Sequence, residues 1–345
     1  MIDRNAAGSV VCGARLRAAG GDVDPDHAAP FHLVTILLTL VAVILAIAIV
    51  GLISWEVRHR RSDLVASWNP STYPGRVSGG LGMLEGGSVS DRLGPDEPAA
   101  VVLVHGLGAT ADYFGDLYEG IGRTRRLVLP DLLGFGRSLD EQRHDFSLDA
   151  QVGAIERGLD AIGAGGGRLV IAGHSTGAAV ALAFAARHPA RVTDVVLWSP
   201  PVRSHAEDAD DADRWRPFGL TTRLHQFGTD WSYRASQWMV RHPTSAGLLT
   251  AWVAPRIPVP VSRRSVVQSW SAYETVIDDF LLHADWVSLF DVDVPVTVFH
   301  GTVDDLVDRT ELTVVARHAR LVEVDGADHH LAVTRPDLLF DLLER

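Results

Sequence analysis

Apolar runs of strand length alternate with helical stretches from Ala99 to the end of the chain, and this rhythm constrains the fold more than any other feature. The runs are rich in Val, Leu and Ile, as expected for strands buried on both faces. Such alternation predicts βαβ units and hence a mostly parallel, doubly wound α/β sheet. Strands are predicted at 100–104, 126–129, 169–172, 192–198, 294–299 and 320–324, and helices at 147–162, 176–187, 309–318 and 335–344.

The rhythm is interrupted between residues 201 and 286. This segment contains several prolines, an acidic stretch at 207–213, and Trp215, Trp231, Trp238, Trp252, Trp270 and Trp286. The acidic stretch is typical of a solvated loop. We expect a mainly helical cap at 201–286, inserted into an α/β core formed by 98–200 and 287–345.

The sequence Gly-His-Ser-Thr-Gly occupies Gly173–Gly177, between a predicted strand and an Ala-rich helix. A strand, a sharp turn and a helix are the setting of a nucleophile elbow. A hydroxyl attacks only when a base removes its proton and donors stabilise the oxyanion. Ser175 is therefore the candidate nucleophile, and the Thr176 N–H at the helix N-terminus is one predicted oxyanion donor. Taken alone, such a pentapeptide also recurs by chance in a Gly-rich chain.

Two more motifs directly follow predicted strands. His105–Gly108 reads His-Gly-Leu-Gly, at the point where a loop N–H supplies the second oxyanion donor, and Leu107 is the predicted donor. Asp131–Ser138 reads Asp-Leu-Leu-Gly-Phe-Gly-Arg-Ser. With these motifs the chain closely resembles the α/β-hydrolase family from about residue 99 to 345. Members of that family commonly show His-Gly after the third strand and Asp-x-x-Gly-x-Gly-x-Ser after the fourth.

The resemblance implies a catalytic triad in the order serine, acid, histidine, with the acid in the turn after a late strand. The family's strand followed by Gly-x-x-Asp matches the stretch ending at Asp304. A buried carboxylate there would orient the histidine and stabilise its protonated form. Asp305 is the adjacent rival and Asp308 a third candidate. An aspartate without a catalytic role would instead cap the helix that begins near Arg309.

The histidine implied by the resemblance lies in the loop after the last strand. Family members usually read Gly-x-Gly-His there, with a proline seven residues later, and Pro336 follows His329 at that spacing. This selects His329 over His330, which we interpret as a surface or pocket-edge residue. Asp328 replaces the usual glycine and could alter the environment of the base. The adjacent histidines match no zinc spacing, so neither a metal nor a cofactor is predicted.

The run Phe31–Ile53 is apolar on every face and carries no charge except any on His32. About 20 apolar residues span a membrane, whereas the apolar part of a secretory signal has roughly 7 to 15 and follows a basic start. The run therefore predicts a transmembrane helix at 31–53. A cleaved signal is the alternative, although the matching Ala46–Ala48 falls inside the run. Three arginines between residues 58 and 61 predict a single-pass protein with a cytoplasmic catalytic domain.

Composition also bears on the segments at 1–30 and 54–97 and on nucleic-acid binding, disulfides and metal sites. Residues 1–30 are rich in Ala, Gly and Asp and predict a flexible tail, whereas 54–97 predict a linker followed by irregular structure or short edge strands. A net charge of -12 gives no electrostatic footprint for nucleic acid. The single cysteine, Cys12, can form neither an intrachain disulfide nor a thiolate metal site.

These features predict a carboxylic-ester hydrolase that works through an acyl-enzyme. Serine rather than aspartate at position 175 argues against the epoxide hydrolase and haloalkane dehalogenase branches, and no His-Gly-Gly-Pro-Gly string supports a proline iminopeptidase. The Trp-rich cap and the predicted anchor favour an apolar, lipid-like acyl substrate, although the tryptophans also fit simple core packing. The alternatives are a C–C hydrolase acting on diketones, a cofactor-free perhydrolase or haloperoxidase, and a catalytically silent binding protein.

Overall fold

The computed structural model describes residues 29–59, 68–94, 96–202 and 258–344, with short pieces between 234 and 247. The chain divides into two units, Met1–Ile53 and Ser54–Arg345. The predicted tail lies almost wholly outside the described residues, and so do the acidic stretch 207–213 and three of the cap tryptophans, Trp215, Trp231 and Trp252.

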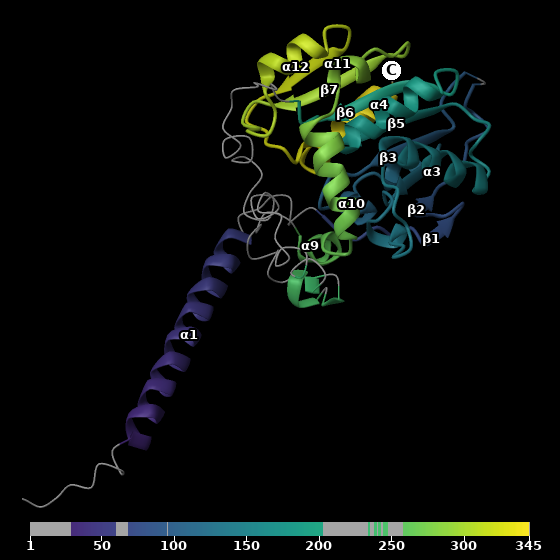
Figure 1. Ribbon diagram of the computed structural model, residues 1–345. Helices are drawn as coiled ribbons and strands as arrows, with labels where there is room; N and C mark the ends of the chain where they lie inside the picture. The colour runs from purple at the N-terminus through teal and green to yellow at the C-terminus, as the bar shows by residue number, and fades with distance from the viewer. Residues whose placement is uncertain are drawn as a thin grey trace, which may run out of the picture. The chain divides into compact units, whose positions relative to one another are not determined.

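The described residues of the second unit form an eight-stranded sheet in the order β1-β2-β4-β3-β5-β6-β7-β8 (Figure 1). All pairs from β4 to β8 are parallel, whereas β1 with β2 and β2 with β4 are antiparallel. The predicted mostly parallel α/β sheet is thus confirmed. The strands are β1 (Gly75–Ser78), β2 (Leu81–Gly86), β3 (Ala100–Val104), β4 (Arg126–Pro130), β5 (Leu169–His174), β6 (Val192–Trp198), β7 (Val296–Gly301) and β8 (Arg320–Val324).

Apolar side chains alternate between two cores, one on each face of the sheet. In β3, Val102 and Val104 belong to one core and Val101 and Leu103 to the other, and all four are fully buried. This alternation explains why the central strands read as continuous apolar runs. The first core is completed by α3 (Leu148–Ala161), α4 (Gly177–Arg187), α11 (Trp286–Leu289) and α12 (Arg309–Val315). The second is completed by η2 (Ala111–Phe114), η3 (Glu119–Arg123), α13 (Leu331–Thr334) and α14 (Asp337–Leu343).

Two prolines account for differences from the predicted element bounds. β7 begins at Val296 rather than at residue 294, because Pro295 has no N–H to donate to the neighbouring strand. The predicted helix 335–344 is observed as α14, preceded by the short α13. Arg335 separates them with φ of -134° and ψ of 60°, since the residue before a proline is disfavoured in the helical region.

The antiparallel edge of the sheet is a hairpin of β1 and β2, in a region where the sequence predicted irregular structure or short edge strands. Its two-residue turn is formed by Gly79 and Gly80, with φ of +58° and +77°. Positive φ at both positions is the conformation that matches the twist of paired strands. β2 then pairs with β4, placing the hairpin beside the parallel strands.

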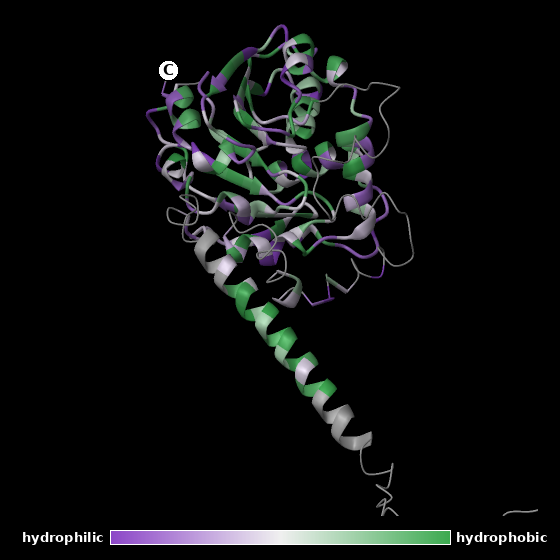
Figure 2. Ribbon diagram, turned by 90° about the vertical axis from the view of Figure 1, so that its left-hand side faces the viewer, coloured by the Kyte–Doolittle hydropathy of each residue, from purple (hydrophilic) through white to green (hydrophobic). Residues whose placement is uncertain are grey.

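Helix α1, Ala29–His59, covers the apolar run at 31–53. Its described side chains from Ile36 to Val50 are all exposed, and the middle of α1 is hydrophobic in Figure 2. Within the part of the chain that the structure describes, no helix is long and apolar enough to cross a membrane. The membrane span at 31–53 stays a prediction.

The described end of the predicted cap is helical. It comprises α9 (Val259–Ser265), α10 (Trp270–Thr275) and the π-helix η6 (Val276–Leu282), followed by α11. The bridge between Phe135 and Gln268 and the bond from the Gly136 N–H to the Val267 carbonyl, 2.8 Å, join the stretch between α9 and α10 to the loop after β4. The boundaries of the cap and of the other segments stay predictions.

Candidate active site

Ser175 occupies the sharp turn between β5 and α4 with φ of +53°, which residues other than glycine rarely adopt. A Cβ on Gly173 would lie 2.4 Å from the Gly177 carbonyl oxygen, and one on Gly177 would lie 2.6 Å from the His105 carbonyl oxygen. Both positions therefore require glycine. The Ser175 N–H donates to the Trp198 carbonyl at 2.9 Å, which ties the turn to the end of β6.

Three predicted side chains meet at the carboxyl ends of the strands. His329, in the loop after β8, accepts a hydrogen bond at Nε2 from the Ser175 hydroxyl, with 2.9 Å between the atoms. Its Nδ1–H donates to Asp304, after β7, at 3.0 Å to Oδ2 and 3.1 Å to Oδ1. The order serine, imidazole, carboxylate is the geometry in which a base can take the serine proton while the acid holds the imidazole.

The Asp304 carboxylate has no exposed surface, and its environment favours the charged form. Burial is the strongest influence and raises its pKa, but the hydrogen bond and charge of His329 lower it, as do the Ser199 hydroxyl and the Leu306 N–H. The pKa of Asp304 consequently lies below its ordinary value of 3.8. An ionised carboxylate at this point stabilises a protonated His329.

The two rival aspartates lie elsewhere. Asp305 is exposed. Asp308 caps α12, where its Oδ1 accepts the N–H groups of Thr310 at 2.9 Å and Glu311 at 3.1 Å. The structure therefore brings Asp304, and neither rival, against His329.

The predicted oxyanion donors lie on both sides of the nucleophile. A Cβ on Gly106 would come within 2.8 Å of Ser175 Cβ, so the loop that carries Leu107 lies directly against Ser175. Thr176 is buried at the N-cap of α4. Within the described part of the chain, neither the Leu107 N–H nor the Thr176 N–H donates a hydrogen bond. Both donors remain available for an oxyanion, as an oxyanion hole requires.

The buried His105 ring holds the loop before Leu107. Its Nδ1–H donates to the Gly106 carbonyl at 2.8 Å, and its Nε2 accepts the Leu132 N–H at 3.0 Å. Burial lowers its pKa against the opposing charge of Asp131, so the ring stays neutral and can both donate and accept. The His105 ring therefore joins the loop after β3 to the loop after β4.

The Asp131 carboxylate gives the second motif its shape. It accepts the Ala111 N–H at 2.6 Å and the Arg137 N–H at 2.8 Å, and it pairs with the Arg137 guanidinium at 3.1 Å. A Cβ on Gly136 would lie 2.6 Å from the carboxyl carbon, so this close approach needs glycine. Asp131 therefore acts as the structural centre of its loop.

Two residues near the triad were not predicted. Ser199, after β6, is buried beside Asp304 with φ of +50°. Tyr113 in η2 is hydrogen-bonded through its hydroxyl to His330 Nδ1 at 3.0 Å, which gives His330 a partner beside the base. The only sequence signal for Ser199 was its position after a strand. The contact between Tyr113 and His330 joins residues 217 apart in the chain.

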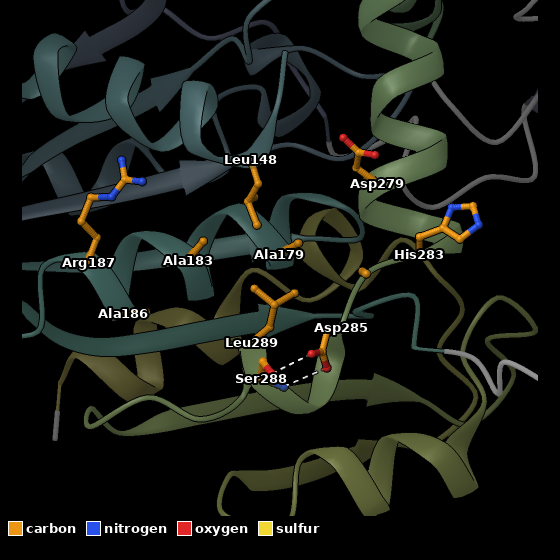
Figure 3. Close-up of a pocket in the computed structure, with 11 residues that line it drawn as sticks. Leu148, Ala179, Ala183, Ala186, Arg187, Asp279, His283, Asp285, Ser288 and Leu289 are labelled. Carbon is orange, nitrogen blue, oxygen red and sulfur yellow. Dashed lines mark hydrogen bonds between the residues drawn. The ribbon is translucent and has the colours of Figure 1, made fainter. Parts of the chain in front are cut away.

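Among the residues that the structure describes, no group of three His, Cys, Asp or Glu side chains could hold a metal ion. A cavity of about 530 Å³ lies between α4 and the segment from η6 to α11 (Figure 3). Ala179 and Ala183 form part of its apolar wall, and Asp285 at its rim accepts hydrogen bonds from Ser288. No triad residue lines this cavity.

Comparison with known proteins identifies the family and the fold. A family model described as the alpha/beta hydrolase fold matches residues 99–336. The chain is 37% identical over 111 residues to "Lipase LipV" of Mycobacterium tuberculosis, covering 32% of this chain and 41% of that protein. It is also 37% identical over 109 residues to "2-hydroxy-6-oxo-6-phenylhexa-2,4-dienoate hydrolase" of Burkholderia cepacia, covering 29% and 36%. These matches span less than half of each relative's length.

A solved structure described as a membrane phospholipase A, a bacterial virulence factor, superposes with a TM-score of 0.57. The superposition covers 92% of this chain and 99% of that chain at 21% identity. At that identity the similarity concerns the fold.

Proposed function

Because the chain belongs to the alpha/beta hydrolase family, we propose that it is a serine hydrolase that cleaves carboxylic esters through Ser175, His329 and Asp304. The continuous set of hydrogen bonds from the Ser175 hydroxyl through His329 to Asp304 carries this proposal. The similarity to a protein named as a lipase supports ester hydrolysis.

In the proposed reaction Ser175 Oγ attacks the ester carbonyl carbon while its proton passes to His329 Nε2. Asp304 stabilises the resulting imidazolium, and the N–H groups of Leu107 and Thr176 stabilise the tetrahedral oxyanion. The intermediate collapses, His329 gives its proton to the departing alcohol, and an acyl-Ser175 ester remains. Water then attacks this ester while His329 takes its proton, and the second tetrahedral intermediate collapses to the carboxylic acid as His329 returns the proton to Ser175 Oγ. Each step uses groups of this chain, so no cofactor or metal enters the scheme.

An apolar acyl group is the proposed substrate feature. The Leu107 side chain packs against a cluster with Trp270, Tyr273 and Ile277 from α10 and η6. An apolar wall beside the loop that stabilises the oxyanion favours burial of a hydrocarbon chain there. Turnover of p-nitrophenyl esters is expected to rise with acyl length, and a preference for acetate over all longer esters would contradict this feature.

We also propose that residues 31–53 anchor the protein in a membrane with the catalytic domain in the cytoplasm, on the basis of the length and apolar character of this run. Protease added to inverted membranes is expected to digest the catalytic domain, whereas protease added to intact cells is not. Digestion in intact cells would place the domain outside, and recovery of the protein in the soluble fraction would exclude the anchor.

Labelling with a serine-directed fluorophosphonate tests the nucleophile. Wild type is expected to label, and Ser175→Ala is expected not to label. Ser88→Ala, which changes an exposed serine, is the matched control and should label like wild type. A wild-type protein that does not label would favour a binding role. Equal labelling of Ser175→Ala would show that Ser175 is not the nucleophile.

A C–C bond hydrolase is the second candidate, because one similar protein is named as a dienoate hydrolase. The two reactions are distinguished by comparing turnover of p-nitrophenyl esters with turnover of vinylogous diketones. Peroxide-dependent halogenation, measured on the same preparation, covers the perhydrolase alternative. Negligible ester turnover beside either other activity would contradict ester hydrolysis.

A further inference from the structure

His174 is the residue before the nucleophile. Its side chain contacts the main chain of the catalytic base and is not part of the triad. It is 4% exposed, and its Nε2 is 2.8 Å from the His329 carbonyl oxygen. A carbonyl only accepts hydrogen bonds, so the proton must lie on Nε2. A residue of the elbow therefore holds the main chain of the loop that carries the base.

Tyr113 holds the same loop at the next residue. Its ring stacks on His174, with 4.9 Å between centroids and 20° between planes, and its hydroxyl is hydrogen-bonded to His330 Nδ1 at 3.0 Å. The Tyr113 carbonyl accepts the Trp68 Nε1–H at 3.1 Å, and this hydrogen bond fixes the main chain of the tyrosine. Two consecutive residues of the base loop, 329 and 330, are thus held by two buried side chains that contact each other.

Burial is the main reason that both side chains stay neutral. Burial, together with the neighbouring His329 and His330, lowers the pKa of His174 well below its ordinary value, while Asp304 acts in the opposite direction. Burial also raises the pKa of Tyr113, and its phenol stays protonated. His174 therefore keeps the tautomer that donates to the His329 carbonyl, and it does not compete with His329 for the Asp304 charge.

We infer that His174 and Tyr113 are positioning residues that fix the base loop, so that His329 Nε2 stays within reach of Ser175 Oγ. This inference rests on the proposed function, because it assigns the pair a role in the same triad. An apolar side chain of equal size could fill the space of His174, but it would leave the His329 carbonyl without its donor. The loop would then shift, and a shift of about 1 Å in a catalytic group can cost about 100-fold in rate.

A matched pair of variants separates the hydrogen bond from packing. The amide N–H of His174→Gln can reach the His329 carbonyl, whereas His174→Met has similar length and volume and no donor. We expect the Gln variant to retain fluorophosphonate labelling within a few-fold of wild type, and the Met variant to label about 10- to 100-fold more slowly. For ester turnover the Met variant should lower kcat and leave KM nearly unchanged. Thermal denaturation of each variant confirms that it is folded.

Tyr113→Phe provides a second test that keeps the stacked ring and removes only the hydroxyl that contacts His330. We expect a several-fold lower labelling rate at an unchanged melting temperature. Equal rates for the Gln and Met variants, or a wild-type rate for folded Met and Phe variants, would overturn the inference while leaving the nucleophile assignment intact. A wild-type protein that does not label would instead refute the proposed function on which the inference rests.

Discussion

The interior of the sheet and the loops at the carboxyl ends of its strands are held together by different forces. In β3, β5 and β6, most side chains are apolar and buried, and stability is spread over many similar contacts. At the strand ends, Ser175 and Ser199 have positive φ, and buried polar groups such as His105, His174 and Asp304 depend on a few specific hydrogen bonds. The interior is therefore expected to govern stability, and the loops to govern chemistry.

The largest effect that would sharpen this comparison is expected at Ser175, the proposed nucleophile. Ser175→Ala should lower kcat by at least about 10,000-fold, since the nucleophile and base act as one unit. Ser175→Gly should lose as much activity yet raise the free energy of unfolding by about 1 kcal/mol, because glycine tolerates the positive φ. Ester turnover and urea denaturation measure the two quantities. A less stable Gly variant would show that the turn is not strained.

A large-to-small substitution in the interior should lower the free energy of unfolding and leave activity nearly unchanged. Leu127 in β4 is fully buried in the second core, and Leu127→Ala should lower the free energy of unfolding by about 2 to 5 kcal/mol. Its kcat/KM, measured well below the melting temperature, should remain within a few-fold of wild type. A loss of activity comparable to that of Ser175→Ala would show that the core governs activity as well as stability.

The free energy of unfolding should fall in acid because two histidines are buried. Burial is the main reason that the pKa values of His105 and His174 lie below the ordinary 6.5. Below that value the unfolded chain binds a proton that each folded ring does not, so the free energy of unfolding falls as the pH falls. Each ring can contribute up to about 1.4 kcal/mol per pH unit.

His174→Gln should reduce this slope, which urea denaturation between about pH 7.5 and 5.5 measures. The same slope in wild type and variant would mean that His174 takes up a proton in the folded protein.

The smallest effect is expected at a partly exposed polar contact outside both regions. Glu119 accepts hydrogen bonds from Ser71 at 2.7 Å and from the Thr72 hydroxyl at 2.6 Å. Partial burial raises the pKa of Glu119, but these bonds outweigh it and leave the pKa below the ordinary 4.5. Glu119→Gln should cost less than about 1 kcal/mol at neutral pH, without a change in kcat.

The difference between the Glu119→Gln variant and wild type should be complete above about pH 4.5 and disappear as the pH falls through the folded pKa, because the carboxylate is then protonated in both states. Thermal denaturation of both proteins over this pH range measures the difference. A difference that persists in acid would mean that packing, and not charge, holds the segment.

The same division explains what the sequence could predict. The runs that became β3, β5 and β6 are readable because strands buried on both faces leave no polar alternation. Ser175, Asp304 and His329 were predicted because short motifs mark the turns that carry them. The hairpin of β1 and β2 was less clear, since its second strand is defined by pairing with β4, more than 40 residues further along the chain. The contact between His174 and the His329 carbonyl joins residues 155 apart, and no local pattern encodes it.

The two outermost strands have a consequence for the behaviour of the protein in concentrated solution. Within the described residues, β1 and β8 each pair on one side only and leave a row of backbone groups that another chain could extend. Both strands carry exposed charges, from Arg76 on one edge and from Arg320 and Glu323 on the other. A second sheet that approached either edge would have to strip water from these charges. The edges therefore resist the addition of strands from other molecules, and this protects a sheet of eight strands from aggregation.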